Sequence, residues 1–525
     1  MAGRLTRKTI ITKMFQLSVV TFISKIVGFV REVFTARYLG VSGLSDAFWS
    51  AFRLPSSLRK IFAEGALSAA LVPTLVEVAK RQGKEQASRT MTAMMLVMQL
   101  ILLAFCTTIA FYSSSVIKLL VPGWACQLGM ERCELAGHLL QILIFFIALA
   151  SAGALFVGLL QVAHSFSIPV VGQLILNLLM IGEWWLYNYY GLPITFIAWA
   201  VLANSLVFLF LCIWMFWRNG FHFLWPNKEA WHDIWHVLKK FVPCALGFGA
   251  MEISFIVDHM FASYLVEGSM SLLRYTYAFT RLPLQVFGTA FATILLPHFT
   301  RIGSYARRRL GFYLFESAKF VWWVTIPATL LMAAFSYQIF NTLFLSAKFT
   351  EAHVQESSIL LSIFIVGLFF FCFEKVVLNA YYSLHQTFVP TVITVGATIL
   401  NTTLNPFFMY FWGVRGLLAA TVLAEVIKLL TLIFVLQRRE QFIFYWQAMG
   451  KFILHDTIQL ACVGWLFFIV YYICSVIVRH FPGSLADIFY NTFIYWFWVG
   501  PLVFGAAVLL FLTRRYFGIR LHFLD

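Results

Sequence analysis

The sequence has little charge: Asp, Glu, Lys and Arg make up 11% of its 525 residues, against about 25% in soluble domains. Hydrophobic residues make up 61% and fall in long runs. A soluble globular domain is therefore excluded, and runs near twenty residues predict an all-α polytopic membrane protein. A transmembrane β-barrel is excluded too, because its strands would read as alternating segments of about ten residues.

Acidic residues are scarce, with 22 Asp and Glu against 38 Lys and Arg and a formal net charge of +16. A basic surplus is also typical of nucleic-acid-binding proteins. Here, however, most of it lies in short segments between apolar runs, where the positive-inside rule accounts for it. With the N-terminus in the cytoplasm, the inner segments hold 22 Lys and Arg and the outer segments hold five. This asymmetry predicts that both termini are cytoplasmic and that there is no nucleic-acid partner.

Cysteines and catalytic motifs are sparse as well. The eight cysteines form no CxxC or Cys/His spacing typical of a metal site. Cys126 and Cys133 share one predicted outer loop, where a disulfide and two free thiols are both open. The chain has no G-x-S-x-G, P-loop or H-E-x-x-H motif. We therefore predict a transporter rather than an enzyme, with no cofactor or metal. Membrane potential or an ion gradient would drive it, and the sequence does not identify the ion.

The apolar runs and the breaks between them predict fourteen transmembrane helices. Glycine and proline mark several of the breaks, as at Gly40–Gly43 and Gly191–Pro193. The predicted spans are 14–38, 44–78, 89–120, 135–163, 168–188, 193–217, 238–265, 269–297, 312–345, 357–384, 389–412, 416–437, 453–478 and 489–512.

An internal repeat groups these spans. The motif Arg-Leu-Pro at 53–55, followed by Pro73, recurs at 281–283, followed by Pro297, at offsets of 228 and 224 residues. Copies six spans apart run in the same direction, which predicts two parallel-related six-helix lobes. The predicted parts are an N-lobe (1–217), a cytoplasmic connector (218–240), a C-lobe (241–438), and two final helices with a basic C-terminal tail (439–525). The second half of the connector predicts an amphipathic helix at the inner surface.

The stretch from Phe22 to Pro73 is apolar enough to enter a bilayer, yet it carries six basic and three acidic residues. A charge at the centre of a lipid-exposed helix costs roughly 2.5–3.5 kcal/mol. We therefore expect these side chains to line a wet cavity whose cationic excess attracts an anion, since the planar fork of Arg matches a phosphate or pyrophosphate. The alternative is a set of ion pairs that only hold the helices together. The residues are Lys25, Arg31, Arg37, Arg53, Arg59 and Lys60, with Glu32, Asp46 and Glu64.

Further charges lie beyond this stretch. The spans 238–265 and 269–297 add four residues that we expect at the same cavity: Glu252, Asp258, Arg274 and Arg281. On the span 357–384, Glu374 and Lys375 are adjacent in sequence, so we expect them to point to different faces. A coupling role and a structural ion pair are both open for Glu252, Glu374 and Lys375, and a substrate-binding role is open for Lys375 as well. Two pairs with the i,i+4 and i,i+3 spacing of structural ion pairs are Lys60–Glu64 and Glu425–Lys428.

Several segments resemble the MurJ family, also called MviN, the lipid II flippases of bacterial cell-wall synthesis. They are SKIVGFVRE at 24–32, SDAFWSAFRLPSSLRKIFAEGALSAALVP at 45–73, VDHMFASYL at 257–265 and LPLQVFGTAFATILLP at 282–297. The family belongs to the multidrug/oligosaccharidyl-lipid/polysaccharide exporter superfamily. The resemblance implies fourteen helices in a V shape, a central cavity from the first, second, seventh and eighth spans, and a groove beside the last two spans for an undecaprenyl tail.

The resemblance also implies which residues bind the substrate. By position, the family's cavity residues fall on Ser24, Lys25, Arg31, Asp46, Arg53, Arg59 and Glu64. Lys25 stands where the family usually has Arg. Tyr277-Ala278 stands where the family usually has an Asp-Arg pair. We expect Arg281, the repeat counterpart of Arg53, to supply the missing cation, and Arg274 is the other candidate.

The function implied by the resemblance is the movement of lipid II, an undecaprenyl-pyrophosphate-linked peptidoglycan precursor, from the inner to the outer leaflet of the bacterial cytoplasmic membrane. Membrane lipids and cell-wall synthesis enzymes are the expected partners besides lipid II. An exporter of another undecaprenyl-linked glycan is one alternative. A membrane scaffold that recruits cell-wall enzymes without transporting anything is another. A drug or cation antiporter is disfavoured, because its cavity should be acidic rather than basic.

Overall fold

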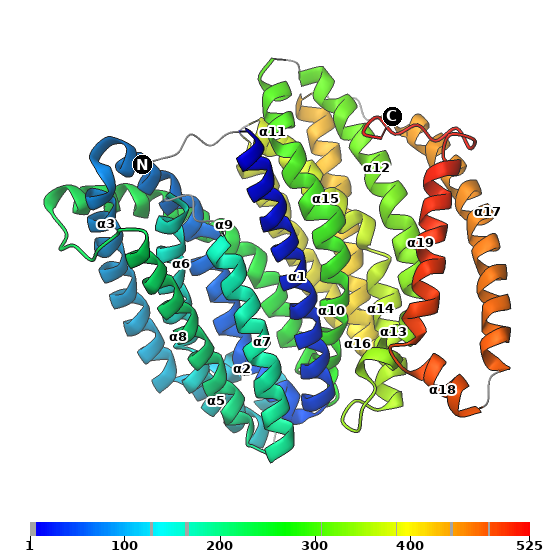
Figure 1. Cartoon of the computed structure of the whole chain (residues 1–525), viewed down its shortest axis with the longest axis horizontal. Coiled ribbons are helices and arrows are strands. Elements are labelled where there is room, and N and C mark those ends of the chain that lie inside the picture. The colour runs from blue at the N-terminus through cyan, green and yellow to red at the C-terminus, as the bar shows by residue number, and fades with distance from the viewer. Residues whose placement is uncertain are drawn as a thin grey trace. The chain divides into compact units, whose positions relative to one another are not determined.

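Helices make up nearly all of the chain in its computed structural model, which describes residues 7–125, 130–162, 167–305, 307–384, 386–440, 445–480 and 483–524 (Figure 1). No strand occurs within these ranges. The chain divides into two compact units, Met1–Ser271 and Leu272–Asp525. The predicted lobes were placed from the sequence repeat, whereas this division follows spatial contacts. The division assigns the connector and the seventh predicted span to the first unit.

In its described residues, the first unit contains eight longer helices that pack side by side, the short helix α4 and two short helical turns. Helix α6 packs against both α3 and α8, α1 runs along α7, and α9 runs along α3 (Figure 1). Phe156 of α6 meets Phe216 of α8 edge to face at 5.3 Å. The elements are α1 (Arg7–Leu39), α2 (Gly43–Arg59), η1 (Lys60–Gly65), α3 (Ala66–Phe111), α4 (Ser113–Leu120), η2 (Pro122–Ala125), α5 (Met130–Leu143), α6 (Phe146–Val162), α7 (Ser167–Tyr190), α8 (Ile194–Arg218) and α9 (Lys228–Ala262).

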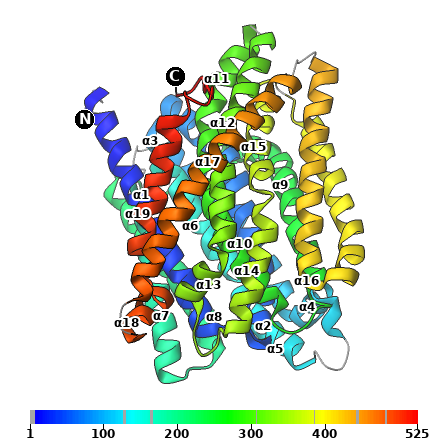
Figure 2. The ribbon, with the colours of Figure 1, turned by 90° about the vertical axis from the view of Figure 1, so that its right-hand side faces the viewer.

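The second unit is built around α15, which packs against α11, α12 and α16. Asn379 of α15 donates to the carbonyl of Ala292 at 2.6 Å, and Tyr381 donates to the carbonyl of Leu432 at 2.7 Å. Helices α17 and α19 lie side by side (Figure 2). The elements are α10 (Ser269–Pro283), whose first turn belongs to the first unit, η4 (Leu284–Thr289), α11 (Ala290–Tyr305), α12 (Arg307–Ala334), α13 (Ser336–Phe344), α14 (Glu351–Ile365), α15 (Leu368–Ser383), α16 (Phe388–Glu440), α17 (Trp446–Arg479), α18 (Gly483–Asn491) and α19 (Tyr495–Thr513).

The helices confirm the predicted fold class. Among the described residues, eight helices are long and apolar enough to cross a membrane, or nine if the bent pair α14 and α15 forms one span. Helix also runs through each of the fourteen predicted spans, but the count of fourteen crossings stays a prediction. Helix α16 contains two predicted spans and α3 joins parts of two others, and each helix breaks between its spans at a glycine. Gly83 has φ +88° and Gly413 has φ +55°, a left-handed conformation that strains other residues.

The repeated Arg-Leu-Pro motif marks the same irregularity in both units. In the first unit, α2 passes into the π-helical turn η1 and then into α3. In the second unit, α10 passes into the π-helical turn η4 and then into α11. The turn η1 begins five residues after Pro55 and η4 begins directly after Pro283. Single π-helical turns are rare and frequently occur at functional sites.

The connector is held against the middle of α3, near its break at Gly83. Asn227 caps α9 by accepting from the backbone N–H of Ala230 at 2.9 Å, and its side-chain amide exchanges two hydrogen bonds with Gln86. The second half of the connector is helical as predicted, with Trp231 exposed and Ala230 and Ile234 buried, and its position at the inner membrane surface stays a prediction. It does not end before the next predicted span, because α9 continues through it to Ala262.

Candidate functional site

The charged side chains of the first unit lie in three groups, the first of which joins α1 to α7. Arg31 Nη2 contacts Glu32 Oε1 at 2.6 Å, and Arg31 Nη1 donates to Asn177 Oδ1 at 3.2 Å. Asn177 in turn donates to the backbone carbonyl of Ser24 at 3.3 Å. The Ser24 side chain is buried and Lys25 is exposed. The guanidinium of Arg31 is thus fixed on one side, while 29% of its side chain stays exposed.

The second group joins η1 to α9. Lys60 Nζ lies 2.8 and 2.9 Å from the two carboxylate oxygens of Glu252, and Ser57 donates to the same carboxylate at 3.0 Å. The ring of Phe255 lies under two cations, 5.6 Å from Arg53 Cζ and 5.7 Å from Lys60 Nζ. Such cation–π contacts stabilise a positive charge without neutralising it.

This group changes the interpretation of two predicted residues. Lys60 was expected to pair with Glu64 one turn away, but the partner that the structure gives it is Glu252 on α9. The side chain of Glu64 lies outside the described part of the structure. Arg59, one residue before η1, lies over the ring of Phe146 at 5.9 Å. Neither ring could be predicted from the sequence, because Phe255 and Phe146 lie on helices distant in the chain from these cations.

The third group surrounds Asp46, which is buried near the start of α2. Its carboxylate accepts from the backbone N–H of Gly268 at 2.7 Å and from that of Ser271 at 2.9 Å, and from the Ser271 hydroxyl at 2.5 Å. These donors belong to the first turn of α10 and to the residue before it. A carboxylate at this position satisfies backbone N–H groups that have no partner within the helix. The geometry therefore gives Asp46 a structural contact, and the predicted substrate contact stays a prediction.

The remaining predicted residues occupy different environments. Asp258 is buried on α9, beside His259, whose Nε2 lies 3.0 Å from the hydroxyl of Ser50. On α10, Arg274 is half-buried and Arg281 is exposed, two residues before Pro283 and η4. Cys133 is buried, and Cys126 lies outside the described residues. The choice between a disulfide and two free thiols, which the sequence leaves open, is therefore not tested.

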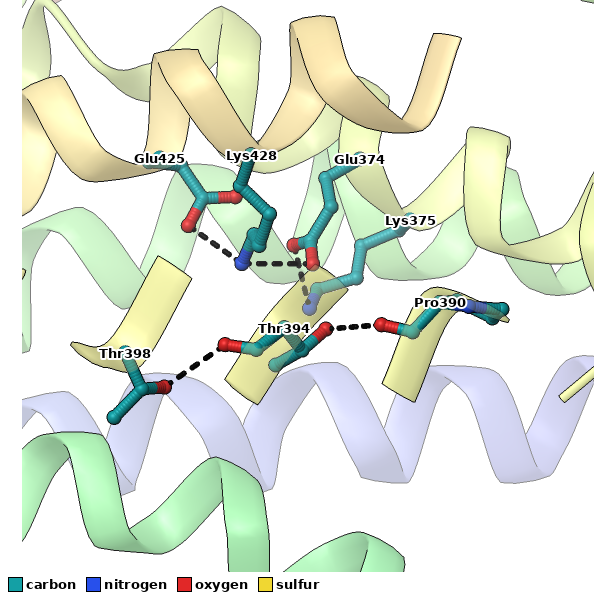
Figure 3. A network of polar contacts seen from close by, with 7 residues as sticks. All are labelled: Glu374, Lys375, Pro390, Thr394, Thr398, Glu425 and Lys428. Atoms are coloured by element: carbon teal, nitrogen blue, oxygen red, sulfur yellow. Dashed lines mark hydrogen bonds and ion pairs between the residues drawn. The ribbon is translucent and has the colours of Figure 1, made fainter. Parts of the chain in front are cut away.

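A cluster of four charges links α15 to α16 in the second unit (Figure 3). Glu374 Oε2 lies 3.2 Å from Lys375 Nζ, and Glu374 Oε1 lies 2.9 Å from Lys428 Nζ. Lys428 also contacts Glu425 Oε2 at 2.7 Å. The expected i,i+3 pair of Glu425 and Lys428 is confirmed. The expectation that Glu374 and Lys375 point to different faces is wrong, because the long lysine side chain reaches back to its neighbour.

The link from Lys428 to Glu374 was missed by the sequence analysis. The two residues are 54 positions apart, and their contact depends on how α15 packs against the second half of α16. The only signal was the presence of charges inside apolar spans, which indicates partners but does not name them. Chemically, the first unit offers partly exposed cations on aromatic rings, whereas the second offers a balanced set of acids and bases.

The fold is that of a polytopic helical membrane protein whose cations lie inside its apolar helices, as in transporters of anionic substrates. Residues 35–490 match the family model of the lipid II flippase MurJ, and the chain belongs to this family. It is 27% identical over 429 residues to the probable lipid II flippase MurJ of Buchnera aphidicola, covering 80% of this chain and 82% of the relative.

Two solved structures share this fold. A lipid II flippase MurJ in an inward closed conformation has a TM-score of 0.76 at 24% identity, covering 96% of this chain and 98% of the other. An inward-facing multidrug-resistance transporter of the MATE family has a TM-score of 0.66 at 14% identity. The match covers 80% of this chain and 94% of the other. The second belongs to the MOP superfamily that the sequence resemblance indicated. At these identities the similarity concerns the fold alone.

Proposed function

We propose that the protein moves lipid II from the inner to the outer leaflet of the bacterial cytoplasmic membrane. The observation that carries the proposal is the match to the lipid II flippase family over residues 35–490, which include all of the cation-bearing α2 and all of α9 and α10. The pyrophosphate of lipid II is anionic, and arginine side chains bind such groups through paired hydrogen bonds. The protein acts as a transporter, and no covalent step is required of it.

The residues proposed to bind the head group are the partly exposed cations. Arg31 is oriented by Glu32 and Asn177, which leaves part of its guanidinium free to meet a phosphate oxygen. Arg53 and Lys60 are held over Phe255, and Arg59 over Phe146, so these rings position the cations. Arg281 would add a cation from α10, with Arg274 as the other candidate. Lys25, Ser24, Asp258 and Glu64 complete the proposed set.

Transport would proceed by alternating access, in which the binding residues face the cytoplasm and the outside in turn. Membrane potential or an ion gradient would supply the free energy, and both termini would be cytoplasmic. The undecaprenyl tail would remain in the lipid, beside α17 and α19, while the polar head group crosses. Cell-wall synthesis enzymes are the proposed protein partners.

The test measures lipid II on the outer leaflet of bacteria depleted of their own flippase. The cells would express, at matched levels, the wild type, Arg31→Ala, or Arg81→Ala as the control. Arg81 pairs with Glu77 on the exposed surface of α3 at 2.8 Å, so its loss removes an arginine without touching the proposed site.

Restoration by the wild type and by Arg81→Ala, with loss in Arg31→Ala, is the expected result. Failure of a correctly inserted wild type to restore exposure would contradict the proposal. It would favour another undecaprenyl-linked glycan as cargo, or a scaffold that does not transport. Equal restoration by all three proteins would show that Arg31 is structural.

A further inference from the structure

The four-charge cluster of the second unit has two unlike ends (Figure 3). Its contacts form one chain from Lys375 through Glu374 and Lys428 to Glu425. The Lys375 side chain is 28% exposed, whereas that of Glu374 is 4% exposed and that of Glu425 is 11% exposed. The Lys375 end is therefore the more open end of this chain of contacts, and the Glu425 end is enclosed by the protein.

The enclosed end contains a carboxylate oxygen that is not satisfied. Glu425 Oε2 contacts Lys428, but Glu425 Oε1 is buried with no hydrogen-bond partner among the described residues. Thr394 and Thr398 lie beside the cluster in Figure 3, yet each donates its hydroxyl hydrogen to a carbonyl of its own helix, at 2.8 and 3.0 Å. A buried ionised group without its full set of hydrogen bonds is costly, at roughly 1–3 kcal/mol or more. In a purely structural ion pair, a buried carboxylate oxygen without a hydrogen-bond partner would only reduce stability.

The charge balance of the cluster selects the ligand. Two carboxylates and two ammonium groups sum to zero, so a metal cation would gain little attraction and would be repelled by two nearby lysines. An anion would meet the same difficulty from the two glutamates. A proton is different, because it needs only one carboxylate oxygen and removes the negative charge that burial disfavours.

We propose that Glu425 is a proton-binding site that couples transport to a proton gradient, with Lys375, Glu374 and Lys428 as its proton path. The coupling role rests on the proposed transport function, whereas proton binding at Glu425 does not. Lys428 gives a proton to Glu425 and is reprotonated from Lys375 through Glu374. Lys375 then takes a proton from a hydronium ion at the open end, which leaves as water. Glu425 ends with one more proton, the other three groups are unchanged, and the cluster charge rises from zero to +1.

The titratable and charged groups around Glu425 are few. Lys428 faces it from its own helix, and Glu374 and Lys375 face it from α15. Helix α14 also packs against α16, and its Glu356 is held by Arg415 at 2.6 and 2.9 Å. Glu356 therefore serves as the matched control, since it is also an ion-paired glutamate of the second unit.

The first measurement is an infrared difference spectrum of the full-length protein in lipid bilayers, between acidic and neutral pH. The wild type should show the carbonyl band of a protonated carboxyl group. Glu425→Gln should lose this band, and Glu356→Gln should keep it. An unchanged band in Glu425→Gln would overturn the proposal. If that variant does not fold, the double variant Glu425→Gln/Lys428→Gln removes one charge of each sign, keeps the Lys375–Glu374 pair, and is judged by the same band.

The second measurement separates coupling from transport. Vesicles with their membrane potential clamped at zero would be given a pH gradient of one unit, and outer-leaflet lipid II would be followed over time. One pH unit corresponds to about a tenfold effect on a coupled equilibrium. The wild type and Glu356→Gln should respond to the gradient, and Glu425→Gln should not. Wild-type export that ignores the gradient would overturn the coupling. A proton band at Glu425 without any lipid II export would support the proton site and contradict the proposed function.

Discussion

The two units stabilise buried cations in different ways. In the first unit, Arg53 lies over the ring of Phe255 and Arg59 over that of Phe146, while Lys60 shares the ring of Phe255 and also pairs with Glu252. In the second unit, Lys375 and Lys428 each contact the carboxylate of Glu374. An aromatic ring stabilises a cation and leaves its charge available to a ligand, whereas a carboxylate cancels it. The comparison indicates that the first unit is suited to attract an anion and the second to exchange protons internally.

The largest effect should come from Lys428→Met, which leaves Glu374 and Glu425 in an apolar region without the lysine they share. Removing one partner of a buried ion pair costs about 3–5 kcal/mol. We expect a clearly lower midpoint of thermal unfolding in detergent. Lys60→Met is the matched variant from the first unit and should cost less, because Glu252 keeps the hydrogen bond from Ser57. Equal losses in both variants would contradict the comparison.

Asp46→Ala should follow in size. The substitution removes the acceptor of two backbone N–H groups and one hydroxyl at the start of α10, and unsatisfied buried groups cost about 1–3 kcal/mol. Asp46→Asn keeps one carbonyl oxygen and should recover part of the loss. Thermal unfolding of the purified protein measures both. An unchanged midpoint in Asp46→Ala would mean that the capping contact is dispensable.

Phe255→Leu tests the role of the ring with a smaller change. Two cation–π contacts of about 0.5–1 kcal/mol each would be lost, while most of the apolar volume remains. Stability should fall slightly, and export should fall more than stability because Arg53 and Lys60 are no longer positioned. Phe223→Leu is the control: its ring contacts Phe156 and Phe216, away from these cations. Similar export by both variants would show that Phe255 does not position the binding cations.

The smallest effect should come from Arg81→Ala on the surface of α3. Its i,i+4 pair with Glu77 is largely exposed, and such pairs contribute below about 0.5 kcal/mol. Both thermal unfolding and lipid II export should match the wild type. A measurable loss would indicate that charge on this surface has a function beyond membrane topology.

The sequence predicted the helical class, the breaks near Gly83 and Gly413, and the repeated Arg-Leu-Pro motif, because hydropathy and glycine act locally. It did not predict that Lys428 meets Glu374 or that Asp46 caps α10. Those contacts join residues far apart in the chain, and their choice of partner depends on packing. The prediction that Glu374 and Lys375 point to different faces failed for a related reason. Helical spacing sets the direction in which a side chain leaves the backbone, but not the position of the terminal ammonium group of a long lysine side chain.

The two copies of the repeat are not equally spaced along the motif. Its two offsets, 228 and 224, differ by four residues, about one helical turn. The structure accounts for the difference in position: four residues separate Pro55 from η1, and none separates Pro283 from η4. The offset between the two copies therefore falls from 228 residues before the π-helical turns to 224 residues after them.

The π-helical turn η1 also has a consequence for editing the gene. Because a π turn holds one residue more than an α turn, deleting a single codon within 60–65 would restore regular α-helix instead of breaking it. Because the extra residue is taken up within this one turn, the helix on either side of the deletion would keep its facing direction. Arg53, Arg59 and Pro73 would then keep their orientation. A deletion of this kind would remove the irregular turn itself and leave the charged side chains around it in place.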